Sequence, residues 1–297
     1  MGLCDDVRTH CASVAAAARH VRIDGERLDA YDLDGPGGRG WVPDPLDAER
    51  HFLDGSREDV AAYLLILDTI NFGSGWFPLL RKRPFSSGYY TVAWALADHV
   101  RASGVPSNER LRAMSTEEIA RILGQDPNLE LMSLFSQALR ELGRFLGDRP
   151  PLAVIEGAEG SAERLAQMLA SGMALFGDTG FYKRAQIVPS DLALAGVTVF
   201  TDLDKLTIFA DNLVPHVLHC DGVLVYDDAL AQHINSGALL PMDEREHEIR
   251  ACAVHACELL ARRLKIAPQA LDTWLWNRGQ DEAYKARPRH RTRTVFY

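Results

Sequence analysis

Apolar residues in long stretches of this sequence lie three and four positions apart, which is the spacing of a helix that buries one face. Ser56 and Ser115 are candidate N-terminal caps, and Glu118 completes a capping box with Ser115. The stretches expected to be helical are residues 2–20, 56–68, 91–102, 116–124, 129–146, 161–176, 244–264 and 268–279. We therefore expect a mainly helical fold.

Segments with the composition of β-strands are few and short. Gln186–Val188, Val197–Phe200 and Val223–Tyr226 could form a small sheet or only extended links between helices. A loop rich in glycine and proline is expected over 34–45. Because no linker or repeat divides the chain, residues 1–297 are expected to form a single α-helical domain with a few short β segments.

The composition is that of an ordinary globular protein, and its charge limits the partners. Of 297 residues, 47% are hydrophobic and 25% are charged, which permits a sizeable buried core. A net charge of −9 disfavours a stable complex with long nucleic acid, because such binding depends on neutralising phosphates. A small molecule held by one local basic pocket is the more suitable partner, and a monomer is expected.

The cysteines and the apolar runs restrict the compartment. Five cysteines, an odd number, without a secretory signal indicate reduced thiols and a cytoplasmic protein. No Cys-x-x-Cys pair occurs, so no structural metal site is expected. No apolar run approaches the roughly 20 residues needed to span a bilayer, so no membrane association is expected.

The segment from Phe200 to Asp211 concentrates charged residues behind an aromatic side chain. It contains three carboxylates and Lys205. Asp202 could cap a helix that begins near Asp204, or it could take part in catalysis. In the first interpretation, in which Asp202 or Asp204 caps the helix, Asp211 is solvated. Both interpretations of Asp202 remain open at this point.

A second candidate site lies on the expected helix 268–279. Asp272 and Trp276 are four residues apart and therefore share a face. A carboxylate beside an indole can bind a cationic or aromatic ligand. Alternatively, the tryptophans pack in the core and Asp272 accepts a hydrogen bond from a neighbouring backbone group. The same helix also carries Thr273, Trp274 and Asn277.

Polar residues near two other expected helices form further candidate sites. Asn71 could bind the edge of a base, or it could satisfy buried backbone together with Asp68. His51 precedes this helix and is either a donor to a ligand or structural. The adjacent cations Lys183 and Arg184 could bind a phosphate, or they form a solvated charge pair.

Five short motifs occur together over most of the chain. In order, they are Asp68-Thr-Ile-Asn-Phe72, Phe181-Tyr-Lys-Arg-Ala-Gln186, Leu206-Thr-Ile-Phe-Ala-Asp211 with Val214-Pro215, Glu248-Ile-Arg250, and Leu271-Asp-x-x-Leu-Trp276. This series resembles the queuosine salvage protein family, whose members are queuosine 5′-phosphate N-glycosylase/hydrolases. The resemblance extends from about residue 51 to the arginine-rich C-terminal segment. Each motif alone is weak, but the five in order are specific.

The resemblance implies both a fold and a reaction. The fold is helical and similar to that of DNA glycosylases. The reaction is hydrolysis of queuosine 5′-monophosphate to queuine and ribose 5-phosphate, without a cofactor or metal. The residues to which the resemblance assigns recognition of the base and the ligand are His51, Phe200, Asp202, Asp272 and Thr273.

Two departures from the family pattern concern the catalytic acid. Asn212-Leu213 stands where relatives often carry Tyr-Arg, and Asn277 stands where relatives can carry an acid. If that acid is the catalytic one, Asp272, Asp202 or Asp281 takes its place in this chain.

Cleavage of an N-glycosidic bond develops positive charge on the ribose and negative charge on the base. A carboxylate near the anomeric carbon can stabilise this charge and deprotonate water, so the expected catalytic residues are Asp272 and Asp202. They are expected to share one cavity, and separate locations would rule out this paired site. The side chains expected to bind queuosine 5′-monophosphate or queuine are His51, Asn71, Phe200, Thr201, Asp202, Thr273, Trp274, Trp276, Asn277, Lys183 and Lys205.

Within this expected site, Phe200 or Trp274 would stack on the base. Lys183, Arg184 or Lys205 would bind the 5′-phosphate. Two other functions remain compatible with the sequence. One is DNA-glycosylase-like excision of a flipped base, with the basic C-terminal segment on DNA. The other is a helical module that binds a nucleoside without turnover.

Overall fold

The structure of the protein, a computed structural model, describes residues 2–33 and 45–297. These residues form fifteen α-helices, three short 3-10 helices and one two-stranded sheet. The mainly helical fold expected from the sequence is confirmed, and the similarity to DNA glycosylases stays a prediction. The loop expected over 34–45 lies, apart from Pro45, outside the described residues.

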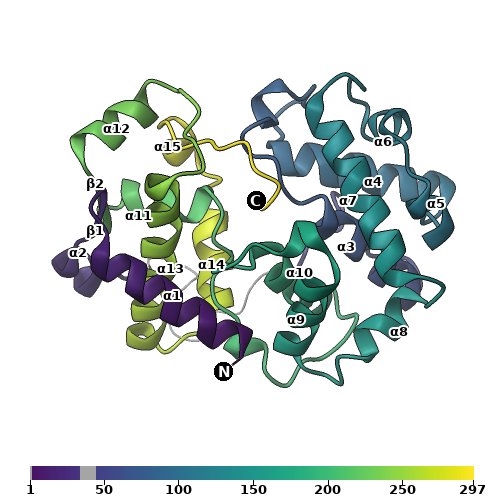
Figure 1. Ribbon diagram of the computed structural model, residues 1–297, viewed down its shortest axis with the longest axis horizontal. Helices are drawn as coiled ribbons and strands as arrows, with labels where there is room; N and C mark the ends of the chain where they lie inside the picture. Colours follow the sequence, from purple (N-terminus) through teal and green to yellow (C-terminus); the bar gives the residue numbers. More distant parts are fainter. Residues whose placement is uncertain (1, 34–44) are drawn as a thin grey trace.

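Figure 1 shows two lobes, with the C-terminal segment running between them. The first lobe, on the right, contains α3 (Arg57–Thr69), η1 (Phe77–Leu79), α4 (Gly88–Ser103), α5 (Asn108–Arg112), α6 (Thr116–Leu123), α7 (Glu130–Leu146) and α8 (Pro151–Glu156). Helix α3 packs against α4, α7 and α8. Its apolar run Val60–Leu67 is buried throughout, which makes α3 the central helix of this lobe.

The second lobe combines the start of the chain with its last third. It contains α1 (Leu3–Ala17), β1 (Val21–Ile23), α2 (Gly25–Ala30), α11 (Leu213–Cys220), β2 (Leu224–Tyr226), α12 (Asp228–Asn235), α13 (Glu244–Leu264), α14 (Pro268–Arg278) and α15 (Glu282–Lys285). Helix α13 is central here, because α1, α11 and α14 all pack against it. Strands β1 and β2 pair antiparallel, with Arg22 opposite Val225.

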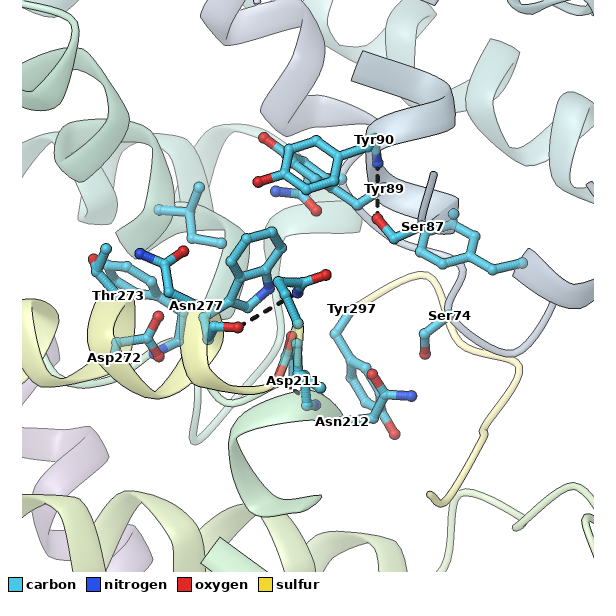
Figure 2. A pocket seen from close by; sticks show the side chains of 18 of the residues that line it. Ser74, Ser87, Tyr89, Tyr90, Asp211, Asn212, Asp272, Thr273, Asn277 and Tyr297 are labelled. Atoms are coloured by element: carbon cyan, nitrogen blue, oxygen red, sulfur yellow. Dashed lines mark hydrogen bonds between the residues drawn. The ribbon is translucent and has the colours of Figure 1, made fainter. Parts of the chain in front are cut away.

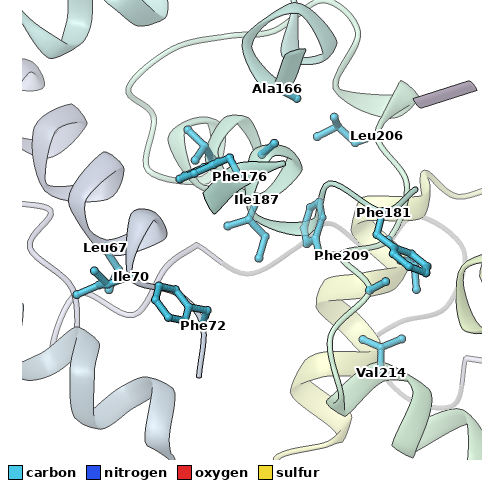
Figure 3. Packing of buried hydrophobic residues seen from close by; sticks show 14 of the residues in the cluster. Leu67, Ile70, Phe72, Ala166, Phe176, Phe181, Ile187, Leu206, Phe209 and Val214 are labelled. Carbon is cyan, nitrogen blue, oxygen red and sulfur yellow. The ribbon is translucent and has the colours of Figure 1, made fainter. Parts of the chain in front are cut away.

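Two helices, α9 (Ala162–Gly172) and α10 (Lys183–Leu194), join the lobes. The short η2 (Ala174–Phe176) lies between them, and η3 (Leu203–Lys205) follows α10. Helix α10 packs on α3 of the first lobe, and α9 packs against α1 of the second. The buried hydrophobic residues form one cluster that extends through both lobes. Figure 3 shows members of this cluster from all three regions, among them Ile70, Phe72, Phe176, Ile187, Phe209 and Val214. That residues 1–297 form a single domain stays a prediction.

The C-terminal segment, residues 288–297, is bonded to both lobes. The amide of Gly73 donates to the carbonyl of Tyr297 at 2.9 Å, and the amide of Leu240 donates to the carbonyl of Arg291 at 2.9 Å. A Cβ at Gly75 would lie 2.5 Å from the carbonyl oxygen of Thr292, so this close approach requires glycine. The segment is therefore an integral part of the junction between the lobes.

The capping signals located helix starts correctly. The side chain of Ser56 accepts a hydrogen bond from the amide of Asp59, and that of Ser115 accepts one from the amide of Glu118. Gly124 ends α6 in the left-handed conformation, which a residue without Cβ adopts readily.

The strand predictions were less accurate. The extended conformation expected for Gln186–Val188 is wrong, because these residues lie inside α10. Most of α10 is buried, and a fully buried apolar run does not distinguish helix from strand by its period. Val197–Phe200 forms no strand within the described residues and is a connecting link. Val223–Tyr226 is confirmed as β2, but its partner Val21–Ile23 was not foreseen.

Candidate functional site

A cleft with a volume of about 920 Å³ lies between the two lobes. Residues within 71–90 of the first lobe line one wall, and residues within 209–213 and 272–280 of the second lobe line the other. Helix α10 and the C-terminal segment complete the lining. Figure 2 shows side chains that converge from these elements, among them Ser87, Tyr89, Tyr90, Asp211, Asp272, Thr273 and Asn277.

Asp272 projects from α14 into the cleft and is only 5% exposed. Its Oδ1 accepts a hydrogen bond from the amide of Phe209 at 2.8 Å, which fixes the orientation of the carboxyl group. Burial, and then the negative charge of Asp211, raise the pKa of Asp272 well above the usual range of a carboxyl group. A carboxyl group with a raised pKa is a better proton acceptor, which is the property that a general base needs.

Lys183 is the cation that faces these acids. It is the first residue of α10, and its Nζ donates to the carbonyl oxygen of Asn71 at 3.1 Å and to its Oδ1 at 3.3 Å. Burial lowers the pKa of Lys183, and the charges of Asp211, Asp68 and Asp272 oppose this shift. Lys183 therefore balances a surplus of negative charge at the junction of the lobes.

Asp211 lines the cleft and lies two residues before the start of α11. Its Oδ1 accepts hydrogen bonds from the amides of Leu213 at 2.7 Å and Val214 at 3.1 Å. Because its position is set by the start of a helix, Asp211 is held firmly beside the cleft. The interpretation that pairs a capping Asp202 with a solvated Asp211 is wrong for Asp211, since its side chain is half-buried and accepts hydrogen bonds from the backbone.

Two further carboxyl groups, those of Asp68 on α3 and Asp191 on α10, interact with each other near Lys183. Asp191 lines the cleft, whereas Asp68 is fully buried. Within the described residues, neither oxygen of Asp68 accepts a hydrogen bond. Burial raises the pKa of both groups, and the positive charge of Lys183 opposes the rise. We therefore expect this pair to retain a proton at pH values where an isolated carboxyl group is ionised.

Aromatic rings form another part of the lining. The ring of Trp276 lies edge-to-face with those of Tyr89, at 5.8 Å, and Tyr90, at 5.6 Å. His51 contacts the carbonyl of Asp47 through Nδ1 at 2.8 Å and the hydroxyl of Tyr89 through Nε2 at 3.0 Å. Because a carbonyl only accepts, Nδ1 carries the proton and Nε2 accepts from the tyrosine. Burial lowers the pKa of His51, which keeps the ring neutral.

Four cations line the cleft near the C-terminal segment. They are Lys82, Lys285, Arg289 and Arg291. Burial lowers the pKa of Lys82, and the nearby positive charge of Arg289 lowers it further. Their neighbours Arg81 and Arg293 form ion pairs, whereas none of these four cations forms one with the part of the chain that the structure describes. Several cations on one side of a cleft, without an ion pair to any described residue, are suited to a phosphate.

Arg184 differs from its neighbour Lys183, because it is a buried structural cation. Its guanidinium lies between the rings of Phe72, at 4.6 Å, and Phe176, at 4.7 Å. It donates hydrogen bonds to three main-chain carbonyls, those of Thr69, Leu175 and Val295. Both interpretations from the sequence, a phosphate ligand and a solvated charge, are therefore wrong for Arg184.

The cleft brings together residues that are distant in the sequence. The expected site residues that line it are His51, Asn71, Lys183, Asp272, Thr273, Trp276 and Asn277. Asp272 also accepts a hydrogen bond from a backbone amide, which was the alternative to ligand binding in the sequence analysis. A bond to the backbone and a place in the cleft are thus compatible for the same carboxyl group.

Asp202 does not reach this cleft. Its Oδ2 accepts a hydrogen bond from the hydroxyl of Ser161 at 2.6 Å, and its Oδ1 accepts one from the amide of Ala162 at 2.6 Å. Both oxygens are therefore used at the start of α9, which is a different helix from the one that the sequence suggested. The prediction that Asp202 and Asp272 share one cavity is wrong.

The other expected residues also lie away from the cleft. Phe200 and Trp274 are buried in the hydrophobic core, and Trp274 contacts Tyr31 edge-to-face. Thr201 is exposed, and its amide donates to a backbone carbonyl of the loop before α9. Lys205 is exposed at the end of η3. The segment 200–205 is thus structural in this fold.

Several cleft residues were not found from the sequence. They are Lys82, Tyr89, Tyr90, Asp191, Arg289 and Tyr297. Helical spacing could have identified Asp191, because Lys183, Ile187 and Asp191 are four residues apart and all three line the cleft. Because 186–188 were expected to be extended, Lys183, Ile187 and Asp191 were not recognised as one face of a helix.

The described residues limit some other kinds of site. Across 2–33 and 45–297, no three His, Cys, Asp or Glu side chains are grouped so as to hold a metal ion. No helix in these ranges combines the length and the apolar character needed to cross a membrane. All five cysteines lie in these ranges, and each is a free thiol.

The chain is similar to proteins of one family along nearly its whole length. The profile of the family described as queuosine salvage protein matches residues 51–297. A relative from Sphaerobacter thermophilus, named queuosine 5′-phosphate N-glycosylase/hydrolase, is 33% identical over 98% of this chain and 97% of its own length. Relatives with the same name from Mus musculus (28% identical, 96% of each chain) and Schizosaccharomyces pombe (24% identical, 99% of this chain and 96% of the relative) are also similar.

Proposed function

Because the chain belongs to the queuosine salvage protein family, we propose that it hydrolyses the N-glycosidic bond of queuosine 5′-monophosphate. The products are queuine and ribose 5-phosphate, so the enzyme recovers queuine for reuse. One observation carries the assignment to this cleft: carboxyl groups, aromatic rings and cations line a single cavity of about 920 Å³. That volume is in the range of pockets that bind small molecules.

Asp272 acts at the anomeric carbon in this proposal. As the C1′–N9 bond breaks, its electron pair leaves with the base and positive charge develops on the ribose. Water bonds to C1′ through its oxygen and loses a proton to Asp272, whose raised pKa suits this role. The nearby carboxyl group of Asp211 adds negative charge that stabilises the developing cation.

The departing base requires help from other groups, because a 7-deazaguanine has no N7 to protonate. Lys183 has a pKa lowered by burial, and it supplies the proton that the leaving base takes up. The amides of Asn71 and Asn277 line the cleft and are available to the polar edge of the base. The ring of Trp276 provides a flat surface, and stacking on such a ring contributes roughly 1–3 kcal/mol.

The 5′-phosphate binds to Lys82 and Arg289. Each charge-assisted hydrogen bond to a phosphate oxygen contributes about 1.5–3 kcal/mol. Burial lowers the pKa of Arg289, and the negative charge of Asp211 opposes this shift. Since Arg289 and Asp211 also line the same cleft, we place the phosphate beside the acids that act on the ribose. Lys183 donates hydrogen bonds to Asn71 and is affected by the charges of the acids, and Lys205 lies outside the cleft, which argues against both as phosphate ligands.

The side chain of queuine carries a secondary amine that is cationic near neutral pH. Besides Asp211 and Asp272, the acids that line the cleft are Asp47, Asp191 and Glu282. Asp47 is paired with Arg50. We assign the cation to Asp191, with which the buried carboxyl group of Asp68 interacts. Binding of an ammonium group would favour ionisation of the pair, because an opposite charge stabilises the carboxylate.

We place the enzyme in the cytoplasm as a monomer that acts on the free nucleotide. Five unpaired thiols suit a reducing compartment. A net charge of −9 argues against a stable complex with nucleic acid.

The test is to incubate the purified protein with queuosine 5′-monophosphate and to measure queuine and ribose 5-phosphate by mass spectrometry. Equal amounts of both products are expected. Excision of a base from duplex DNA, with salt-dependent DNA binding, would instead support a DNA glycosylase. Tight queuine binding without turnover would support a binding module. Either result, without release of queuine from the nucleotide, overturns the proposal.

A further inference from the structure

Arg250 lies outside the cleft and holds two parts of its lining. It belongs to α13, and its side chain is only 2% exposed. Its two terminal nitrogens bind the carboxyl group of Asp178, at 3.1 Å to Oδ1 and 2.6 Å to Oδ2. Neither residue is among those that line the cleft. Two parallel hydrogen bonds of this kind fix orientation as well as distance.

The third nitrogen of Arg250 reaches the segment that carries Asp211. Its Nε donates to the carbonyl of Ala210 at 2.9 Å, and Ala210 directly precedes Asp211. A hydrogen bond to this carbonyl restricts the peptide plane that leads into the acid. Arg250 therefore acts on the position of Asp211 through the backbone.

Asp178 reaches the segment that carries Lys183. Its Oδ2 accepts a hydrogen bond from the amide of Lys183 at 3.3 Å. Its carbonyl accepts from the amides of Phe181 at 3.0 Å and Tyr182 at 2.7 Å. Tyr182 has a φ of +50°, so the turn before α10 depends on these contacts. Asp178 thus sets where α10, and with it Lys183, begins.

Aromatic rings prevent the guanidinium of Arg250 from moving. It lies 3.9 Å from the centre of the Phe181 ring and 4.6 Å from that of the Tyr297 ring. Phe181 belongs to the turn before α10, and Tyr297 lines the cleft from the C-terminal segment. One side chain therefore contacts three segments of the cleft's surroundings.

We propose that Arg250, through its bonds to Asp178 and to the carbonyl of Ala210, holds Lys183 and Asp211 opposite each other in the cleft. Arg250 is a positioning residue, because it does not contact the cleft itself. The inference rests on the proposed function, in which these two residues serve the reaction. Displacement of a reacting group by about 1 Å can reduce turnover by about 100-fold.

The matched control is Arg8. Its Nε binds the carboxyl group of Glu258 on α13 at 2.9 Å, and a terminal nitrogen donates to the carbonyl of Lys205 at 2.8 Å. It therefore joins a carboxylate and a backbone carbonyl, as Arg250 does, but none of these three residues lines the cleft. Arg8→Lys should lower stability without affecting turnover.

The first measurement is of kcat and KM for queuosine 5′-monophosphate in Arg250→Lys and Arg8→Lys. Lysine keeps the charge but cannot make the paired contacts of a guanidinium. For Arg250→Lys we expect kcat to fall by about 10–100-fold with KM nearly unchanged. For Arg8→Lys we expect kcat within about twofold of the wild type. Asp178→Asn is the second variant if Arg250→Lys does not fold, with the same expected direction.

The second measurement does not need activity. Trace acetylation of Lys183 is followed against pH by peptide mass spectrometry, which reports the pKa of its amine. The charges that affect this amine are those of Asp211, Arg184, Asp68, Asp272 and Asp191. If Asp211 moves away, its stabilisation of the ammonium is lost, so the midpoint falls by about 1 pH unit. Arg8→Lys should leave the midpoint unchanged.

The two measurements separate the inference from the proposed function. A wild type that does not release queuine overturns the proposed function, and the labelling midpoint still tests the positioning by Arg250. An unchanged midpoint in Arg250→Lys, or in Asp178→Asn, overturns the inference, whatever happens to kcat. A fall in both kcat and the midpoint, confined to these variants, supports it.

Discussion

The regions around Asp202 and Asp272 each place a buried carboxyl group close to aromatic side chains, yet they have different roles. Both oxygens of Asp202 accept short hydrogen bonds from the start of α9. Within the part of the chain that the structure describes, Asp272 accepts a backbone hydrogen bond through Oδ1 alone, at Phe209, and the group faces the cleft. A carboxylate whose hydrogen bonds are satisfied stabilises the fold, whereas one left partly unsatisfied and facing a cavity is available for chemistry.

The largest expected effect is on turnover in Asp272→Asn. The amide cannot take a proton from water or stabilise the positive ribose as a carboxylate does, so kcat should fall by about 100–1,000-fold. Steady-state kinetics with queuosine 5′-monophosphate measure this effect. Circular dichroism of the variant should match the wild type. Full activity in Asp272→Asn would show that Asp272, like Asp202, has no catalytic role.

The second effect contrasts the cations of the two regions. Arg289→Met removes a phosphate contact and should raise KM for the 5′-monophosphate by about 10–100-fold. KM for the nucleoside queuosine should change little, because it has no phosphate. Lys205→Met, near Asp202, is the control and should leave both KM values unchanged. An equal rise of both KM values in Arg289→Met would show that Arg289 does not bind the phosphate.

The third effect concerns the stability cost of acids beside the cleft. Burial raises the pKa of Asp68 and Asp191, so the folded protein holds protons that the unfolded chain releases above about pH 4. Their contribution is therefore most favourable at low pH, and it is lost as pH rises through the folded pKa. Asp68→Asn should raise the free energy of unfolding by about 1–3 kcal/mol at pH 8.

The pH dependence provides the internal control for this prediction. At pH 4.5 the gain in Asp68→Asn should be much smaller, because the cost of the buried carboxyl group accumulates as pH rises from the unfolded pKa, about 4, to the raised folded pKa, and most of that interval lies above pH 4.5. Urea unfolding at the two pH values gives the comparison. If Asp68→Asn is less stable than the wild type at pH 8, the carboxyl group of Asp68 does not lower the free energy of unfolding, and the prediction is wrong.

The smallest effect is at Asp202 itself. Asp202→Ala removes the carboxylate that caps α9 and should cost about 1 kcal/mol, or roughly 2–4 °C in Tm. Turnover by the folded variant should remain within about twofold of the wild type. Calorimetry and kinetics on the same preparation test both parts. A large loss of kcat without a loss of Tm would show that Asp202 serves catalysis and not the stability of the fold.

Helices could be predicted from the sequence where one face is buried and a cap marks the start. Ser56 and Ser115 cap α3 and α6 as expected, because a hydroxyl at this position satisfies an amide that the helix leaves free. Helix α10 could not be predicted in the same way. Its residues pack against α3 and α9 and are mostly buried. Apolar residues therefore occur on most sides of α10, and their spacing does not show the period of a helix.

The candidate site could be predicted in part for a related reason. Asp272 and Trp276 were found because their spacing places them on one helical face, and both line the cleft. Asp191 was missed with the rest of the α10 face. Lys82 and Arg289 were missed because nothing local indicates that residues so far apart in the chain face the same cavity.

The sequence by itself determined that the chain is mainly helical, where most helices begin, and that one face of α14 carries a carboxylate beside an indole. Those properties depend on neighbouring residues, whose spacing and hydrogen bonding are local. Only the tertiary structure decided which carboxyl group is free to react. Asp202 meets the start of α9, and Asp272 meets Phe209 and the cleft. The partners of a carboxylate come from distant segments, and they determine its charge, its solvation and its role.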